Sequence, residues 1–511
     1  MSSDPVDVEL SGRAFDLPRI EGLYGRPVRV SVSEGVRERV RASRQRVEAI
    51  LSRDEPYYGI NTGIASLCRT RVGAEQLDAL QANLLMSHAV GVGEPAPDAV
   101  VRLMLLFKAH ALGLGYSGIR PETLELVAGL LSRDVLPVVP TRGSLGASGD
   151  LAPLAHLSLP LIGRGAVRHG GRVVPAAEGL RAAGLSAVRL RAKEGLALIN
   201  GTQFMTAYGA ALCVRGRRAA KLADVIAAMQ LEAVCGVLSP FDERLFGVRR
   251  HPGAGESAEN VRRVLSGSRR PRGEAARERV QDPYSLRCVP QVHGAVRDVI
   301  AHAAEVILRD VNGVTDNPVV FENGDVVSGG NFHGEPVALA LDYLATALCE
   351  LASIAERRMF LVLSGRFGLP AGLVEKNGVN SGLLITQYTA AALTAENKVL
   401  AHPASVDSIP TADGQEDHVS MGATAATKCW QIVDNVETVL AIELLAAAQG
   451  LDFCKPGEVA PAAAAAHAAV RRRVAHADAD RVFAEDIAAA RGMAASGELM
   501  EAVEAVTGAL R

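Results

Sequence analysis

From about residue 200 onward, apolar residues recur every three or four positions over unusually long stretches. Four of these stretches lie at 291–311, 335 to about 364, 383–401 and 428–449. They are rich in alanine and longer than the usual globular helix of about 11–12 residues. Helices of this kind bury their apolar faces against one another in a bundle, and any remaining apolar surface against neighbouring subunits. We therefore expect a mainly α-helical fold with a long central helical bundle.

The first 200 residues combine short strand-like runs with shorter helical segments. The predicted elements are a strand in RPVRVSV (26–32) and helices at 33–51, 74–90, 98–112 and 121–132. Glycine turns between short alternating runs predict hairpins at 166–175 and 317–330. The Arg-, Gly- and Pro-rich stretch 240–280 is expected to be an exposed excursion. We divide the chain into a smaller mixed α/β domain, 1–200, and a long-helix bundle domain, 201–511.

Charge and composition argue against several classes of partner. The formal net charge is −3 and only 4% of the residues are aromatic, which disfavours nucleic acid and anionic membranes as partners. The seven cysteines are scattered and form no CxxC pair, so neither a disulfide framework nor a structural zinc site is expected. The acidic start MSSDPVDVEL has no signal-peptide pattern, and Asp342, Glu350 and Glu356 interrupt an apolar run. We expect a reduced, cytoplasmic protein without a membrane span.

Three short motifs resemble known sites but lack the context that those sites need. GLGYSG (113–118) matches the dinucleotide fingerprint, but a helical pattern precedes it and Pro121 would fall inside the helix that must follow. GASGD (146–150) has aspartate where the GxSxG elbow of a hydrolase needs glycine. HGE (333–335) resembles the HxE of zinc deaminases, but their PCxxC is missing. The sequence therefore predicts no nicotinamide cofactor, no hydrolase serine and no metal.

Three small residues, Ala147-Ser148-Gly149, lie between an apolar approach and an apolar helix-like run. In a tight bend the Gly149 amide nitrogen can attack the Ala147 carbonyl, because small residues permit the close approach. The closed ring would then lose one water molecule, and the serine side chain would lose a second. The product is a methylidene group conjugated to an imidazolone, which is a strong electrophile. Asp150 could relay protons in this reaction and cap a helix that begins at Leu151. A plain turn with an N-cap is the alternative interpretation of these residues alone.

The segments around this run and along the chain resemble those of the aromatic amino-acid lyase family, and most closely its histidine-specific members. That family builds 4-methylidene-imidazol-5-one (MIO) from Ala-Ser-Gly, and the resemblance extends from about residue 25 to 490. The matching segments are YYGINTG (57–63), LQANLLMSHAVGVGEP (80–95), GSLGASGDLAPLAHLSLPLIG (143–163), KEGLALINGTQ (193–203), QDPYSLRCVPQVHGA (281–295), DNPVVF (316–321), SGGNFHGEP (328–336) and QEDHVSMG (415–422). The resemblance implies the mainly α architecture of that family and of the fumarases. It also implies MIO from Ala147, Ser148 and Gly149, without metal, NAD or pyridoxal phosphate (PLP), in a homotetramer with shared active sites.

The resemblance also assigns roles to single residues. Tyr58 looks like the base that removes the β-proton, and a phenol with an ordinary pKa of about 10 needs a positive environment for that role. Arg287 matches the clamp for the substrate carboxylate, which a planar guanidinium suits. The other implied site residues are Tyr284, catalytic and near the cofactor; Gln281 and Asn200, bonded to the substrate or the imidazolone; and Phe332, against the substrate ring. Without the surrounding matches, each would be an ordinary structural residue.

Two positions bear on the choice of substrate. Ser87-His88 stands where phenylalanine and tyrosine lyases usually have Phe-Leu or His-Leu, so His88 would hydrogen-bond an imidazole. Glu416 stands where those enzymes generally have glutamine. A carboxylate suits a ring with an N–H donor or a positive charge and is a poor neighbour for phenyl. Glu416 could also handle protons, so we assign it to substrate binding and to catalysis.

The resemblance therefore implies elimination of ammonia from the small-molecule substrate L-histidine to give trans-urocanate. Either the amine or the ring of the substrate could add to the methylidene carbon. The alternatives within the family are a tyrosine or phenylalanine ammonia-lyase and a 2,3-aminomutase, which His88 and Glu416 disfavour. A catalytically inactive scaffold homologue is the alternative from another class. One departure from the family pattern, Ile64-Ala65 in place of Phe-Gly, is expected to affect loop mobility and turnover.

Overall fold

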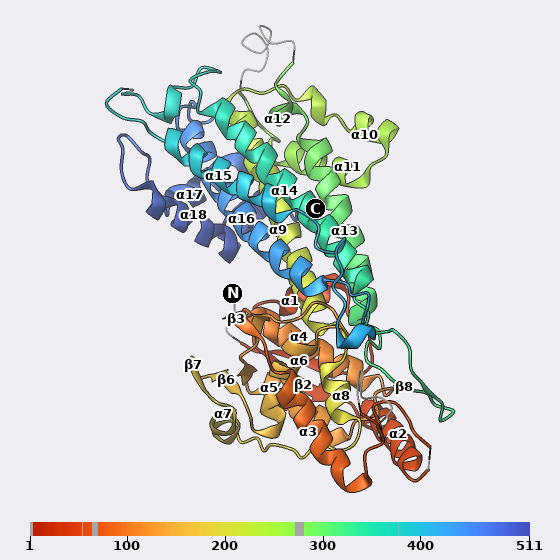
Figure 1. Ribbon diagram of the computed structural model, residues 1–511. Coiled ribbons are helices and arrows are strands. Elements are labelled where there is room, and N and C mark those ends of the chain that lie inside the picture. Colours follow the sequence, from red (N-terminus) through yellow and green to blue (C-terminus); the bar gives the residue numbers. More distant parts are fainter. Residues whose placement is uncertain (1–3, 54, 64–69, 271–280, 377) are drawn as a thin grey trace. The chain divides into compact units, whose positions relative to one another are not determined.

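The computed structural model describes residues 4–53, 55–63, 70–270, 281–376 and 378–511 (Figure 1). The chain forms two compact units, each made of segments that are separate in the sequence. The first unit comprises Met1–Val214, Ala303–Asp342 and Pro403–Thr427, and the second Arg215–His302, Tyr343–His402 and Lys428–Arg511. These units are discontinuous in the sequence, whereas the predicted domains at 1–200 and 201–511 are continuous. The two divisions rest on different criteria, and the predicted domains stay a prediction.

Helices dominate both units, which confirms the predicted mainly α fold (Figure 1). They are α1 (Leu17–Leu23), α2 (Glu34–Leu51), α3 (Leu77–His88), α4 (Asp98–Gly113), α5 (Pro121–Ser132), α6 (Leu151–Ser158), α7 (Ala176–Ala182), α8 (Glu194–Ile199), α9 (Gln203–Ala233), α10 (Glu243–Arg249), α11 (Pro252–Val264), α12 (Tyr284–Arg287), α13 (Val289–Val311), α14 (Glu335–Val362), α15 (Leu384–Leu400), α16 (Gly422–Asp452), α17 (Pro461–Arg471), α18 (Phe483–Ser496) and α19 (Glu498–Thr507). The predicted helices at 33–51, 98–112 and 121–132 agree with α2, α4 and α5 to within one or two residues at each end.

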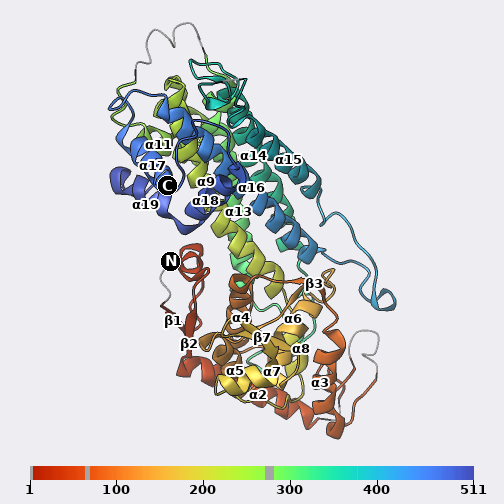
Figure 2. The same ribbon diagram turned by 90° about the vertical axis from the view of Figure 1, so that its left-hand side faces the viewer.

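Four long helices, α9, α13, α14 and α16, run alongside one another in the bundle, as both views show (Figures 1 and 2). Their facing sides are rich in buried alanine and leucine, so the backbones can approach closely. Inside the second unit the Arg358 guanidinium of α14 donates to the Glu443 carboxylate of α16 over 2.6 Å, and both side chains are fully buried. Removing either partner would leave an uncompensated buried charge, which is strongly destabilising.

The strands are short and lie in the first unit. They are β1 (Val6–Leu10), β2 (Val28–Val32), β3 (Val92–Pro95), β4 (Leu136–Pro137), β5 (Pro140–Arg142), β6 (Ala166–His169), β7 (Arg172–Pro175), β8 (Val319–Val320) and β9 (Val326–Val327). β1 and β2 are parallel, β3 pairs with β5, and β4, β6 and β7 form an antiparallel sheet. Both predicted hairpins are present, as β6–β7 and β8–β9.

The predicted exposed excursion at 240–280 is wrong for one of its parts. Helix α11 has a buried face that includes Ala258 and Val264. Its small residues conceal this face from a search for large apolar side chains, because they permit close contact: a Cβ on Gly253 would lie 2.3 Å from the Gly294 carbonyl oxygen. Residues 271–280 lie outside the described part. The GLGYSG segment (113–118) ends α4 and leads to α5, so no strand precedes its glycines.

Among the described residues, one helix, α14, is long and apolar enough to span a membrane by length and composition. Of the most apolar 18-residue stretch of α14, 67% is buried inside the protein, as in the core helix of a globular protein.

Candidate active site

The Ala147-Ser148-Gly149 run forms a tight turn in the first unit, immediately before α6. The Gly149 amide donates to the Gly146 carbonyl oxygen across the turn, at 3.1 Å. Ser148 has φ +53° and Gly149 has φ +79°, so both lie in the left-handed region. That region is uncommon for a residue with a side chain, and the turn therefore holds Ser148 in a conformation that few sequences adopt.

The segment between α8 and α9 forms a cradle for this turn. Asn200 Nδ2 donates to the Ser148 carbonyl oxygen at 2.9 Å, and the Gly201 amide donates to the same oxygen at 3.4 Å. In return, the Asp150 amide donates to the Gly201 carbonyl at 2.7 Å. A Cβ on Gly149 would lie only 2.1 Å from the Gly201 oxygen, so no residue with a side chain fits there.

These residues fit an imidazolone ring closed between Ala147 and Gly149. The Gly149 amide is turned back across the bend toward Gly146, and Gly149 has no Cβ, which would collide with the Gly201 oxygen. The oxygen that would become the ring carbonyl is that of Ser148, which already accepts from two donors. The local structure is therefore suited to the cyclisation that the sequence predicts.

The carboxylate of Asp150 does not cap α6 as predicted, although α6 does begin at Leu151. Its Oδ2 accepts instead from the amides of Phe204 and Met205, both at 3.0 Å, in the first turn of α9. The first amides of any helix lack partners within the helix, and an aspartate from another segment can satisfy them. Asp150 thus joins the turn to the start of the long helix.

Asp150 and Lys108 are two fully buried ionisable groups beside the turn. Burial raises the pKa of Asp150 to about 7, although the two amide donors and Lys108 act in the opposite direction. Burial likewise lowers the pKa of Lys108 to about 8. Lys108 Nζ donates to the Asn200 carbonyl at 2.8 Å, so it also holds the cradle in place. Both groups can therefore exchange a proton near neutral pH.

The raised pKa of Asp150 predicts a pH dependence of stability. Between pH values of about 4 and 7 the unfolded chain releases this proton while the folded chain retains it, so the free energy of unfolding falls by up to about 1.4 kcal/mol per pH unit. An Asp150→Asn variant has no such proton and is expected to lose this part of the slope. Thermal unfolding midpoints measured from about pH 5 to 7 check the prediction; equal slopes for the two proteins would contradict it.

A cavity of about 680 Å³ opens beside the turn within the first unit. It is lined by Pro56, Tyr58, Thr62, Gly146, Ala147, Ser148, Leu196, Asn200, Asn317, Ser328, Gly329, Gly330, Phe332, His333, Gln415, Glu416, Asp417, His418 and Val419. Its size is within the range of small-molecule sites, about 300–1,000 Å³. The structure thus brings six of the predicted site residues to one cavity: Tyr58, Ala147, Ser148, Asn200, Phe332 and Glu416.

Glu416 is held at this cavity by both carboxylate oxygens. The Ser148 hydroxyl donates to its Oε1 at 3.4 Å, and the Thr411 hydroxyl donates to its Oε2 at 2.8 Å. Backbone hydrogen bonds between Thr411 and Glu416, in both directions, close the loop that carries them. The carboxylate is therefore positioned before any ligand binds, and one of its present donors is the hydroxyl that cyclisation would remove.

The other predicted site residues lie elsewhere. His88 ends α3, where its Nδ1 is 2.9 Å from the Leu84 carbonyl oxygen, and it is not among the described lining residues. Tyr284 and Arg287 lie on α12 of the second unit, with the guanidinium 4.7 Å from the ring centroid and the tyrosine 70% exposed. Gln281 is exposed in the same unit. The departure at 64–65 lies outside the described residues.

Sequence reasoning missed Thr411, Gly201 and Lys108. Lys108 carried a signal, because it is one charge inside the apolar run LMLLFKAHAL, and a buried lysine must find acceptors. No sequence signal marked Thr411, since a hydroxyl five residues before a glutamate is common. Gly201 follows Asn200, but only the folded chain reveals that its amide faces the Ser148 carbonyl.

The chain is similar to known proteins over nearly its whole length. The family model for "Aromatic amino acid lyase" matches residues 16–472. Among curated relatives, a histidine ammonia-lyase of Symbiobacterium thermophilum is 53% identical over 98% of this chain and 99% of its own length. A histidine ammonia-lyase of Sorangium cellulosum is 49% identical over 98% of this chain and 100% of its own length. Among solved structures, histidine ammonia-lyase from Trypanosoma cruzi has a TM-score of 0.90 at 39% identity, covering 98% of this chain and 96% of its own. A tyrosine aminomutase from Streptomyces globisporus has a TM-score of 0.94 at 35% identity, covering 99% and 100%.

Proposed function

The chain belongs to the aromatic amino acid lyase family, and on that premise we propose that it eliminates ammonia from L-histidine to give trans-urocanate. It is a carbon–nitrogen lyase. The observation that carries the choice of histidine is Glu416, a carboxylate held beside Ser148 in the cavity. An imidazole can donate an N–H to its Oε1, whereas a phenyl ring would leave that oxygen desolvated without a donor once the Ser148 hydroxyl is lost. The histidine ammonia-lyases among the relatives support the same choice.

We further propose that Ala147, Ser148 and Gly149 form MIO, which supplies an electrophilic methylidene carbon that the twenty standard side chains do not offer. In its formation the Gly149 nitrogen bonds to the Ala147 carbonyl carbon. The Ala147 oxygen leaves as water with the amide hydrogens of Ser148 and Gly149. The Ser148 hydroxyl then leaves as a second water with the Cα hydrogen. The cradle of Asn200 and Gly201 supports this proposal.

Asn200 and Gly201 would also act during turnover. They donate to the Ser148 oxygen, where negative charge would gather if electron density moved toward the ring. Donors fixed in advance at such an oxygen stabilise the transition state without reorganising, and the loss of one typically costs about 10²–10³ in rate. Tyr58 lines the same cavity and would accept the β-proton of the substrate. Phe332 would pack against the imidazole.

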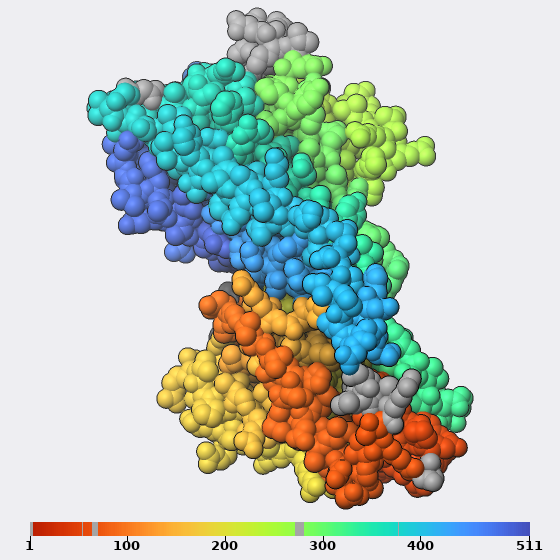
Figure 3. Space-filling model, in the orientation of Figure 1, coloured from red at the N-terminus to blue at the C-terminus, as the bar shows by residue number. Residues whose placement is uncertain are grey.

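The remaining predicted contacts would come together in a homotetramer with shared active sites. In this arrangement His88 would bond the imidazole, Arg287 would bind the carboxylate, and Gln281 and Tyr284 would approach the substrate and the cofactor region. Helix α15 supports the proposal of further subunits, because it lies at the surface of the second unit (cyan, Figure 3) with Ile385, Tyr388 and Val399 more than half exposed. We also propose a cytoplasmic location.

A Glu416→Gln variant tests the choice of substrate. Glutamine keeps an acceptor for the Thr411 hydroxyl but removes the charge that an imidazole N–H meets. We expect kcat/KM for L-histidine to fall by about 10²-fold or more, through loss of a charge-assisted hydrogen bond and of proton handling. The value of kcat/KM is measured from the steady-state formation of the conjugated acrylate, followed in the near ultraviolet. Unchanged kcat/KM would contradict the assigned role.

The proposed reaction is tested by offering L-histidine, L-tyrosine and L-phenylalanine separately to the purified wild-type chain. Acrylate is expected from L-histidine alone. Product from tyrosine and none from histidine would overturn the proposal. The similarity to a tyrosine aminomutase gives a second candidate, a 2,3-aminomutase, and a β-amino acid among the products would identify it.

A further inference from the structure

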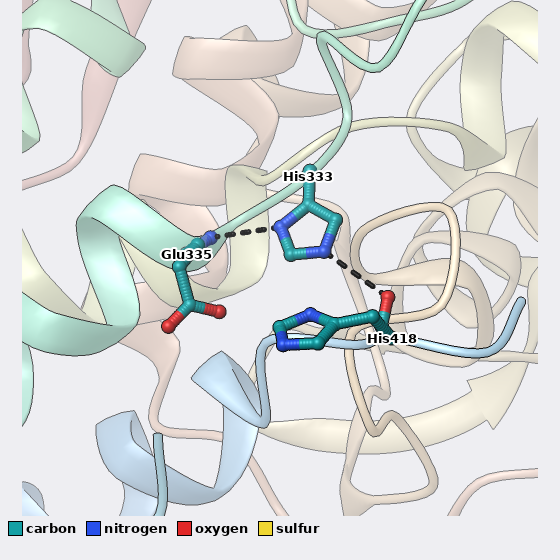
Figure 4. A group of neighbouring side chains, drawn as sticks. All are labelled: His333, Glu335 and His418. Atoms are coloured by element: carbon teal, nitrogen blue, oxygen red, sulfur yellow. Dashed lines mark hydrogen bonds between the residues drawn. The ribbon is translucent and has the colours of Figure 1, made fainter. Parts of the chain in front are cut away.

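Three potential metal ligands, His333, Glu335 and His418, lie together at one side of the cavity (Figure 4). Both histidines line the cavity, and Glu335 is the first residue of α14. The candidate ligand atoms, one from each residue, all lie within 4.8 Å of one another. The two histidines are 85 positions apart in the sequence, and all three residues belong to the first unit. The sequence motif HGE thus acquires a third ligand that no local spacing indicates.

His333 is already oriented in the manner of a metal ligand. Its Nε2 is 3.2 Å from the His418 carbonyl oxygen, an acceptor, so Nε2 carries the proton and donates. Its Nδ1 then carries the lone pair, and Figure 4 shows that atom facing the backbone nitrogen of Glu335. A histidine that binds a metal usually donates its other N–H to a carbonyl or carboxylate, which fixes the tautomer and the ring. The present hydrogen bond supplies this support.

The lone pair of His333 Nδ1 accepts from the Glu335 amide at 3.3 Å. That distance exceeds the usual N–H···O or N–H···N length of about 2.9–3.0 Å, so the bond is weak and its loss costs little. Coordination at Nδ1 would replace this bond and leave the Nε2–H donation to His418 intact.

Glu335 gives an independent indication that the cluster accepts a cation. Its Oε2 is buried and has no hydrogen-bond partner among the described residues. An unpartnered buried carboxylate oxygen is costly, and a cation beside it removes that cost. The exposed ring of His418 stacks on that of His333, with centroids 5.8 Å apart and planes at 30°. One of its ring nitrogens lies within 4.8 Å of the candidate ligand atoms of His333 and Glu335.

We propose that His333, Glu335 and His418 bind one late first-row divalent cation of the zinc type, with water in the remaining positions. Two imidazoles and one carboxylate are a donor set for Zn²⁺, Co²⁺, Ni²⁺ and Cu²⁺, whereas Mg²⁺ and Ca²⁺ require oxygen ligands. The cation would join the segment 332–335 to the segment 415–419, which border the cavity beside Phe332 and Glu416. The two histidines share the cavity with the proposed active site, but the inference does not rest on the elimination reaction.

The test is a titration of tag-free full-length protein, dialysed against a chelator, with Co²⁺ and with Zn²⁺ in the absence of substrate. Calorimetry is expected to give one saturable site per chain, and Co²⁺ is expected to develop the visible bands of a site with mixed nitrogen and oxygen ligands. His418→Asn and Glu335→Gln are each expected to weaken binding by about 10–100-fold or more. His251→Asn, which removes an exposed imidazole in the second unit, is the matched control and should bind as the wild type does.

A second measurement guards against misfolded variants. Zn²⁺ is expected to raise the thermal unfolding midpoint of the wild type and of His251→Asn, but not of His418→Asn or Glu335→Gln, whose midpoints without metal show whether they fold. Absence of a saturable site, or equal affinity in all four proteins, would overturn the inference. Because no substrate is present, that result is independent of whether the chain turns over L-histidine.

Discussion

A Ser148→Ala variant is expected to turn over L-histidine roughly 10³-fold or more slowly than the wild type, a loss typical of removing a group that takes part in covalent catalysis. Alanine lacks the hydroxyl whose departure would create the methylidene carbon, so the electrophile cannot form. The fold should survive, because the Ser148 hydroxyl makes one long hydrogen bond, 3.4 Å to Glu416. Turnover at saturating substrate and the thermal unfolding midpoint together separate loss of chemistry from loss of structure.

Ser144→Ala is the matched control for this variant. The Ser144 hydroxyl lies in the same turn, where it donates to the Gly149 carbonyl at 3.2 Å and accepts from the Gly146 amide at 3.2 Å. Its removal loosens the turn but leaves every atom of the proposed ring in place. We expect a much smaller loss of turnover than for Ser148→Ala. Wild-type turnover by Ser148→Ala would contradict the proposed cofactor.

A Tyr58→Phe variant is expected to lower kcat by about 10²–10⁴-fold, the usual contribution of a general base. The substitution removes only the phenolic oxygen of a cavity-lining side chain and keeps its ring. Substrate contacts outside that oxygen are unchanged, so KM should move far less than kcat. Steady-state kinetics with L-histidine measure both constants.

The neighbouring Tyr57 supplies a control of the same chemistry. Its hydroxyl donates to the Glu55 carboxylate at 2.8 Å, and Tyr57 is not among the described residues that line the cavity. Tyr57→Phe should therefore retain turnover within a small factor of the wild type. A larger loss in Tyr57→Phe than in Tyr58→Phe would show that the base has been assigned to the wrong tyrosine.

The helices of this fold could be predicted from the sequence because their signal is local. Apolar periodicity gave α14 and α15 nearly to their ends, and the Gly170-Gly171 turn gave the β6–β7 hairpin. Helix α11 was not predicted because its buried face is mostly glycine, alanine and polar residues, with only two valines to give a hydrophobic signal. Its contacts depend on how closely two backbones approach, and that is a property of the folded chain.

Several residues that line the candidate site could be predicted from the sequence, but its hydrogen bonds could not. The resemblance named Ser148, Asn200 and Glu416, and the structure brings all three to one cavity. The polar partners within the site lie at very different separations in the sequence: Asp150 bonds the first turn of α9, more than 50 positions away, whereas Glu416 is fixed by Thr411, five positions before it. A carboxylate has several potential donors within reach of its own segment, so sequence alone cannot select the tertiary one.

The central claim is that the chain converts Ala147-Ser148-Gly149 into its own electrophile. The most direct test is the mass of the tag-free purified chain, together with that of the proteolytic peptide that contains Ser148. We expect a mass lower by two water molecules, with the whole loss confined to that peptide and absent from Ser148→Ala. An unmodified mass in a preparation that converts L-histidine to urocanate would contradict it.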